Sequence, residues 1–232
     1  MGKRLKREEA IARLRGDLAD VLGPRLLSLV AYDAPGPDAE LVRALAVVEG
    51  FGADDLLRLA PAAAGWKREG LAVPLIFDRQ ELPRVVDAFP LEFSQILARH
   101  EVVAGDTVLA GLSVPREDLR RACEAQARSH LLHLREGYLE AGGAAKNLAG
   151  LVAASLPSLR ALVLNAARLL DAGPDSPAAF AAFVAERLPA AAGLVPLLGL
   201  APDAALAPSE AERLFPAYLE GVNHLARALD QL

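Results

Sequence analysis

Two hydrophobic periodicities follow one another along this chain, and the change between them near Gly105 limits the folds open to it. Before that glycine, short apolar runs are bounded by Gly, Pro and Asp, a pattern typical of buried strands that alternate with helices. After it, apolar residues recur every 3.6 positions over long stretches, as in amphipathic helices. The 232 residues therefore predict an α+β fold, with a mixed α/β domain over residues 1–110 and a helical bundle over residues 111–232.

The first part contains four apolar segments with the length of strands. They are Leu26–Tyr32, Leu45–Val48, Leu71–Phe77 and Ile96–Val103. Pro74 lacks an N–H donor, so it predicts an edge position or a bulge for the third of them. Helices are expected over Lys3–Leu22, from Ala53 onward and over Glu81–Ala88. Pro61 is expected to end or kink the second of these helices.

The second part shows helical periodicity throughout. Long helices are predicted over Pro115–Ala141 and Ala144–Leu170, and Pro157 is expected to kink the latter. Ser176 before a proline is a typical helix start, and Ser209 opens a capping box before the last helix. These apolar faces exceed what one small bundle buries. We therefore expect a homodimer, or a protein partner, to bind through this part.

Composition excludes several classes of protein. With 25 Lys+Arg against 30 Asp+Glu, the formal net charge is -5, so no strong nucleic-acid binding is expected. The single cysteine, Cys123, excludes an intramolecular disulfide and cysteine-rich zinc sites, and it suits a reducing, cytoplasmic location. The basic start of the chain lacks the apolar run of a signal peptide. Arginines or prolines interrupt the two most apolar stretches, 148–170 and 190–206, so no membrane segment is expected.

Familiar motifs for nucleophilic and phosphate-binding sites are absent from the sequence. No Gly-x-Gly-x-x-Gly, Gly-x4-Gly-Lys-Ser/Thr or Gly-x-Ser-x-Gly occurs. His130 and His133 are three residues apart on a predicted helix, but no recognised spacing supplies a third metal ligand, so core or surface histidines are the favoured interpretation. Cys123 falls on an apolar stripe, which predicts a buried small side chain rather than a nucleophile.

The order of the predicted elements is helix, apolar strand, turn, second strand, helix and third strand, followed by an all-helical part. In this order the chain resembles the DNA polymerase β-like nucleotidyltransferases with a C-terminal helical domain of the HEPN or substrate-binding type. The segment Phe89–Asp106, which ends in a Gly-Asp turn, adds to the likeness. The resemblance implies Gly-Ser after the first strand, to hold a nucleoside triphosphate, and Asp-x-Asp at the second strand, to hold two Mg²⁺ ions.

This sequence departs from the family at both motifs. Asp33 stands where the glycine is expected, and the two metal-binding positions fall on Val42 and Ala44, which cannot bind a cation. We therefore predict a catalytically inactive relative, without a cofactor, that acts as a binding or scaffolding protein. The alternative is a divergent Mg²⁺-dependent nucleotidyltransferase that transfers a nucleoside monophosphate to a small molecule or a protein. That enzyme would use Asp33, Asp38 and Glu40 for the metal.

Four polar residues of the first part are candidates for lining a pocket: Tyr32, Asp33, Arg99 and His100. The first two stand at the end of the first predicted strand, and the other two lie on the fourth. A solvated edge strand with a turn at Gly105 is the favoured interpretation of that fourth segment.

In the second part, Arg128 and His133 match the loose Arg-x4-6-His pattern of HEPN ribonucleases. Five residues along a regular helix turn through about 500°, so the two side chains are expected to point roughly 140° apart. That separation is poor geometry for joint catalysis, and the match is short enough to arise by chance.

Overall fold

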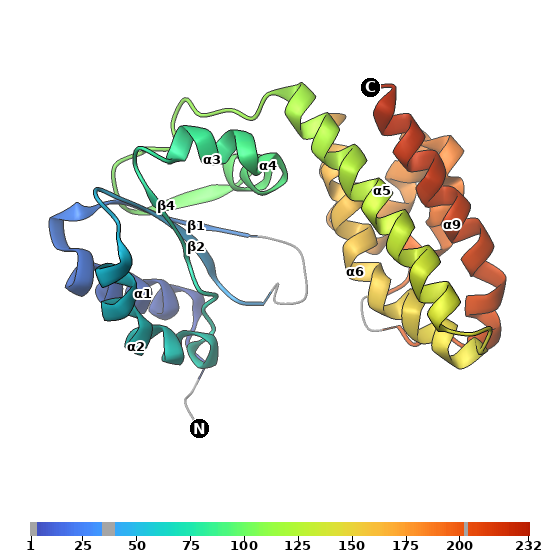
Figure 1. Cartoon of the computed structure of the whole chain (residues 1–232), viewed down its shortest axis with the longest axis horizontal. Helices are drawn as coiled ribbons and strands as arrows, with labels where there is room; N and C mark the ends of the chain where they lie inside the picture. The colour runs from blue at the N-terminus through green and yellow to red at the C-terminus, as the bar shows by residue number, and fades with distance from the viewer. Residues whose placement is uncertain (1–3, 34–39, 202–203) are drawn as a thin grey trace. The chain divides into compact units, whose positions relative to one another are not determined.

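The computed structural model of the chain describes residues 4–33, 40–201 and 204–232 (Figure 1). The chain divides into two compact units, Met1–Val114 and Pro115–Leu232. The first contains a four-stranded mixed sheet with helices and the second is built of helices, so the predicted α+β fold is confirmed. Val108, Leu112 and Val114 pack against the core of the first unit. For this reason the first unit extends past residue 110, where the sequence placed the boundary.

The sheet has the strand order β3-β2-β1-β4. Its strands are β1 (Leu26–Tyr32), β2 (Arg43–Val48), β3 (Leu75–Asp78) and β4 (His100–Gly105). Strand β1 is antiparallel to both β2 and β4, whereas β2 and β3 are parallel. The first strand has the predicted bounds. Strand β3 begins only after Pro74 and forms one edge of the sheet, as that proline predicts.

Helices cover both faces of the sheet and make the first unit a three-layer structure. They are α1 (Arg7–Leu22) and α2 (Ala53–Glu69) on one face, and α3 (Leu82–Ala88) and α4 (Pro90–Ala98) on the other (Figure 1). A short 3-10 turn, η1 (Gly23–Arg25), joins α1 to β1. Side chains alternate between the faces along β2, where Ala44 and Ala46 pack toward α1 and α2 while Leu45 packs toward α3 and α4.

Helix α2 continues through Pro61 to Glu69, so the expectation that the helix ends at this proline is wrong. A proline removes the hydrogen bond to the carbonyl four residues earlier, and here that residue is Leu57, which is exposed to solvent. Beyond the proline, Trp66 is buried against α1 and donates a hydrogen bond from Nε1 to Asp17 Oδ2 at 2.8 Å. This packing stabilises the second half of the helix.

The fourth predicted strand, Ile96–Val103, combines the end of a helix with the start of a strand. Residues 96–98 belong to α4, in which Phe93 and Ile96 face the core one turn apart. Strand β4 begins at His100 and lies at the other edge of the sheet. Three residues are too few to show a helical period, which explains the error at the start of this segment.

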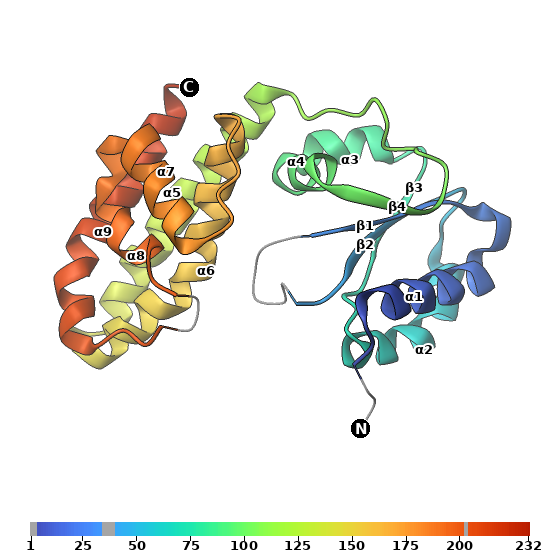
Figure 2. The same cartoon turned by 180° about the vertical axis from the view of Figure 1, so that it is seen from behind.

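The second unit packs its helices around an apolar core. They are α5 (Arg116–Glu140), α6 (Ala145–Leu169), α7 (Pro177–Arg187), the 3-10 segment η2 (Pro189–Leu194), α8 (Val195–Leu198) and α9 (Pro208–Asp230). The three long helices α5, α6 and α9 pack against one another (Figure 2). Cys123 lies on the buried side of α5, as its place on the apolar stripe predicts.

The starts of two helices test the predicted capping residues. Ser176 caps α7 as predicted, because its hydroxyl accepts a hydrogen bond from the backbone N–H of Ala179 at 3.3 Å. The capping box predicted at Ser209 is wrong, since α9 begins at Pro208 with Ala207 as the N-cap. The fixed φ of proline suits the first position of a helix and places the start before the serine.

Helix α6 is continuous from Ala145 to Leu169 through Pro157, where a kink was expected. The carbonyl that loses its partner belongs to Ala153, which is exposed to solvent. Among the described residues, α6 is the one helix with the length and mean hydropathy, 1.5, of a membrane span. It packs against α5 and α9, and the expected absence of a membrane segment stays a prediction.

Candidate functional site

Three polar residues form one row across the end of the sheet, which we call the strand-end row: Arg43, Tyr32 and His100. Tyr32 of β1 pairs with Arg43 of β2 on one side and with His100 of β4 on the other. Directly paired residues of antiparallel strands point to the same face. Here it is the face covered by α3 and α4, because Tyr32 belongs to that core. The structure thus brings together two of the predicted pocket residues and adds Arg43, which the sequence reasoning missed.

The strand-end row is rich in hydrogen-bond donors. Burial raises the pKa of the Tyr32 phenol, and the guanidinium of Arg43 acts in the opposite direction. Nε of Arg43 is itself buried and has no hydrogen-bond partner among the described residues. His100 is exposed, and its Nδ1 donates to the carbonyl oxygen of Ile96 at 2.9 Å. Buried donors without a partner are rare, so the Arg43 position suits an acceptor atom from a ligand or from solvent.

Two of the three carboxylates considered for Mg²⁺ line one pocket near the same strand ends. This pocket has a volume of 280 Å³, and Asp33 and Glu40 share it with Arg4 and Arg7. Arg7 Nη1 lies 3.2 Å from Asp33 Oδ1, and Arg4 donates to the backbone carbonyl of Glu40. The two guanidinium groups oppose the charge that would attract a divalent cation. The third carboxylate, Asp38, lies outside the described residues.

The two residues that the resemblance places at metal-binding positions do not fit Mg²⁺. Val42 and Ala44 are 7% and 3% exposed and belong to the apolar core between the sheet and helices α1 and α2. Proteins hold Mg²⁺ with carboxylate oxygens, substrate phosphates and water, and neither side chain supplies an oxygen. Within the described parts of the chain, no group of three or more His, Cys, Asp or Glu side chains is placed to hold a metal ion.

The other two predicted pocket residues take different positions. The backbone carbonyl of Asp33 accepts a hydrogen bond from Gln95 Nε2 of α4 at 3.3 Å, so residue 33 stays beside the strand-end row. Arg99 connects α4 to β4, and its side chain is exposed to solvent. The structure therefore places Asp33 with Tyr32 and His100 but leaves Arg99 outside this group.

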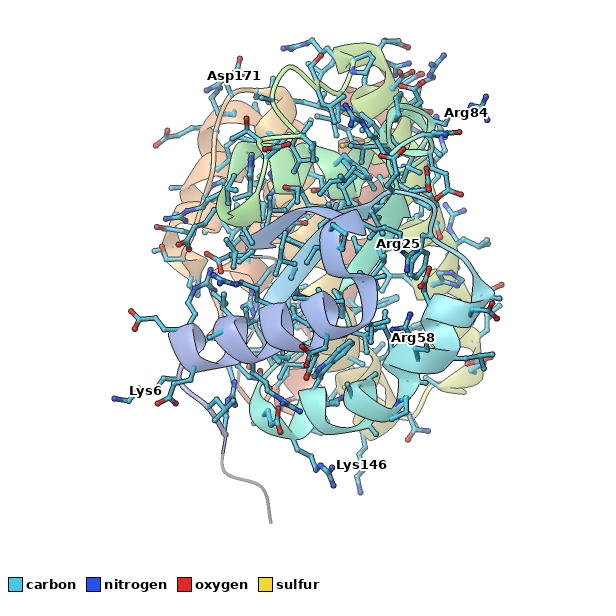
Figure 3. All side chains as sticks on the ribbon, turned by 90° about the vertical axis from the view of Figure 1, so that its left-hand side faces the viewer. Lys6, Arg25, Arg58, Arg84, Lys146 and Asp171 are labelled. Atoms are coloured by element: carbon cyan, nitrogen blue, oxygen red, sulfur yellow. The ribbon has the colours of Figure 1, made fainter. Side chains whose placement is uncertain are left out.

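A second polar cluster, at the start of α2, holds the loop between β2 and this helix. Arg25, which is labelled in Figure 3, makes a two-point ion pair with Asp55, at 2.6 and 3.0 Å, and donates to the carbonyl of Gly50. The Asp78 carboxylate accepts hydrogen bonds from the backbone N–H groups of Gln80 and Gly50. The Arg25 guanidinium lowers the pKa of Asp55, and the backbone donors, first that of Gln80, lower the pKa of Asp78. Because these carboxylates already have partners, we assign the cluster a structural role.

The candidate residues of α5 have separate partners. His130 Nε2 lies 2.6 Å from the hydroxyl oxygen of Tyr218, whereas His133 pairs with Glu136 at 3.0 Å on an exposed surface. Arg128 pairs with a glutamate one turn earlier in the helix, at 2.6 Å. Arg128 and His133 thus engage different groups, as their angular separation predicts, and among the described residues no third ligand joins the two histidines.

No protein-family model matches the chain, and no curated protein matches it. Among solved structures, the chain is similar to spectinomycin adenyltransferase AAD(9) from Enterococcus faecialis, in its crystal structure with ATP and spectinomycin. The two chains are 11% identical, with a TM-score of 0.46, and the similarity covers 96% of this chain and 99% of that chain.

Proposed function

We propose that this chain is a nucleotidyltransferase-like protein that binds a ligand or partner and does not transfer nucleotides. The order of α1, β1, β2, α2 and β3 ahead of a helical unit supports the resemblance drawn from the sequence. One observation supports the lack of transfer: Val42 and Ala44 occupy the metal positions inside an apolar core. Metal-assisted nucleotidyl transfer depends on carboxylates that hold the ions against the phosphates.

The polar groups at the strand ends suit an anionic ligand that binds without a metal. Arg43 offers a buried Nε donor that has no partner among the residues described, and Tyr32 lies beside it in the sheet. Arg4 and Arg7 line a neighbouring pocket, but Arg7 is already paired with Asp33 and Arg4 with the carbonyl of Glu40, so the proposal rests on Arg43. Guanidinium groups recognise carboxylate and phosphate oxygens directly, so this binding is expected to be independent of Mg²⁺.

Thermal unfolding with ATP, GTP, CTP and UTP, each with and without Mg²⁺, tests this proposal. If one of them is the ligand, the unfolding midpoint rises to the same extent with and without the metal. A ligand at about 100 times its Kd stabilises the folded state by roughly 2.7 kcal/mol, which is several degrees for a chain of this size. Transfer of labelled nucleoside monophosphate to a small molecule or to the protein itself is expected to be undetectable.

Two arginines near the strand ends provide a matched pair of variants for this experiment. Arg43→Gln should abolish any nucleotide-dependent rise, whereas Arg99→Gln, at an exposed position, should leave it unchanged. The opposite result has two parts. The unfolding midpoint would rise only with Mg²⁺, and the chain would transfer nucleoside monophosphate in a reaction that Asp33→Asn or Glu40→Gln abolishes. That result would show that the chain is a nucleotidyltransferase and would refute the proposed binding protein.

We also propose that the helical unit pairs with a second copy of the chain. Leu132 and Leu139 of α5 are 52% and 78% exposed, and residues seven positions apart lie on the same side of a helix. Light scattering is expected to give twice the mass of one chain. Glutamate at both positions should give the monomer, because association would then strip water from carboxylates. Leu57→Glu, at an exposed site of α2, is the control, and a monomer over a wide concentration range would refute the pairing.

A further inference from the structure

A pocket between α5 and α6 contains polar groups for which the proposed function has no use. It has a volume of 240 Å³ and is lined by His130, His133 and Leu134 of α5 and by Leu151, Ala154, Ser155 and Ser158 of α6. Three of these side chains are hydrocarbon and form an apolar wall. All of the lining residues belong to the helical unit, so the pocket is complete within that unit.

A chain of hydrogen bonds behind the pocket determines where the proton of His130 sits. Ser155 Oγ donates to the carbonyl oxygen of Val152 at 2.8 Å, and the Tyr218 hydroxyl donates to Ser155 Oγ at 3.0 Å. Each hydroxyl has one proton, so neither is left to donate to the imidazole. In this arrangement of the two hydroxyls, the proton of the 2.6 Å contact between Tyr218 and His130 sits on Nε2, which donates to the Tyr218 oxygen. Nδ1 is left as an acceptor.

Burial keeps this imidazole neutral. Tyr218 is fully buried, and burial raises the pKa of its phenol above the ordinary value. Burial likewise lowers the pKa of His130 to about 4, with a contribution from the charge of His133. Near neutral pH, His130 Nδ1 therefore presents a lone pair, and no hydrogen bond in the described structure engages that nitrogen.

These features restrict the chemistry of a ligand. An anion would set its own lone pairs against that of Nδ1, and an ammonium ion would lose its hydration against Leu134, Leu151 and Ala154. An uncharged ring with an N–H or O–H group suits both the apolar wall and the acceptor nitrogen. An engineered apolar cavity of about 150 Å³ takes up benzene. The pocket between α5 and α6 is open to solvent at Ala154 and Ser158, and its 240 Å³ leaves room for a bicyclic ring with one exposed edge.

We propose that the pocket between α5 and α6 binds a small, uncharged aromatic molecule that donates a hydrogen bond to Nδ1 of His130. The Ser158 hydroxyl offers a second polar contact on the same lining. Binding here involves none of the strand-end residues and requires neither nucleotide nor metal, so it is tested separately from the function proposed above.

Indole and benzofuran are matched probes for this pocket, because they have the same shape and differ in a donor N–H against an acceptor oxygen. Calorimetric titration of the full chain is expected to show saturable binding of indole, and binding of benzofuran weaker by about tenfold or more, as for the loss of one hydrogen bond. Ala154→Phe fills the pocket and should weaken indole binding to a similar degree. Ala153→Phe is the control, because Ala153 is equally exposed on the same helix but does not line the pocket.

The nitrogen resonances of His130 give a second measurement. Indole is expected to shift the Nδ1 resonance in the wild-type chain and in Ala153→Phe, and to leave it unchanged in Ala154→Phe, provided that circular dichroism shows both variants to be folded. The proposal is overturned if indole does not saturate up to its solubility, if both probes bind equally, or if Ala154→Phe binds indole like the wild type.

Discussion

Replacing Trp66 with alanine is expected to lower the free energy of unfolding of the first unit by about 3–5 kcal/mol. Trp66 is 1% exposed and packs in the cluster that joins α1, α2 and the sheet. Its Nε1 also donates to buried Asp17 at 2.8 Å, so the variant leaves a cavity and removes one of the two partners of this carboxylate, which keeps its ion pair with Arg13 at 3.2 Å. Denaturant titration followed by far-UV circular dichroism measures this loss without depending on the fluorescence of the residue removed.

Leu57→Ala is the matched control for this variant. Leu57 lies on the same helix but is 73% exposed, so its truncation should change the stability by less than about 0.5 kcal/mol. The helical unit is expected to keep its own unfolding midpoint in the Trp66→Ala chain, because the altered core contains residues of the first unit alone. Equal stabilities of the two variants would contradict the packing of α2 on α1.

Trp66→Ala is also expected to weaken ligand binding at the pocket lined by Arg4 and Arg7, because α1 and the residues before it pack against α2. Leu5 donates its backbone N–H to the carbonyl of Glu69, near the end of α2, at 3.1 Å. Its neighbours Arg4 and Arg7 line the pocket with Asp33 and Glu40. If α2 loosens from α1, these two guanidinium groups lose their fixed positions. Any anion that binds at this pocket should therefore bind more weakly to Trp66→Ala than to the Leu57→Ala control.

Local sequence signals identified elements wherever a short segment had clear boundaries. The run Leu26–Tyr32 stands between Gly-Pro and Asp-Ala-Pro, and β1 has these bounds. Ser176 was recognisable as the cap of α7 because a serine directly before a proline is also a local signal. The stop expected at Pro61 failed because tertiary packing of Trp66 outweighs one lost hydrogen bond. Propensity decides where a helix can end, but packing decides whether it does.

The candidate site was less predictable, because contacts between strands and between helices depend on pairings that no local pattern contains. Tyr32 and His100 meet only because β4 pairs with β1. Arg43 did leave a signal, since it is a charged residue within an otherwise apolar run. Neither Tyr218 nor Ser155 could be recognised from the sequence. Tyr218 lies on the apolar stripe of α9, and Ser155 matches no motif.

Lowering the pH from about 6.5 to about 4 is expected to destabilise the helical unit through His130. In the unfolded chain this imidazole takes up its proton near pH 6.5, whereas burial lowers the pKa in the folded state to about 4. Between these values the unfolded state holds one more proton, so stability falls as the pH falls, by about 1.4 kcal/mol per pH unit and about 3 kcal/mol in total. Above pH 6.5 the contribution is fully present and constant.

His130→Gln isolates this contribution, because the glutamine amide can still donate to Tyr218 but does not titrate. The groups that face His130 are Tyr218 of α9 and His133 of its own helix. His133→Gln is therefore the control, and it should keep the steep loss of stability below pH 6.5. Carboxyl groups elsewhere affect all three chains alike, so the difference between wild type and His130→Gln reports one imidazole. If those two lose stability in parallel, His130 takes up its proton as readily in the folded chain as in the unfolded chain, and the expected effect of its burial is refuted.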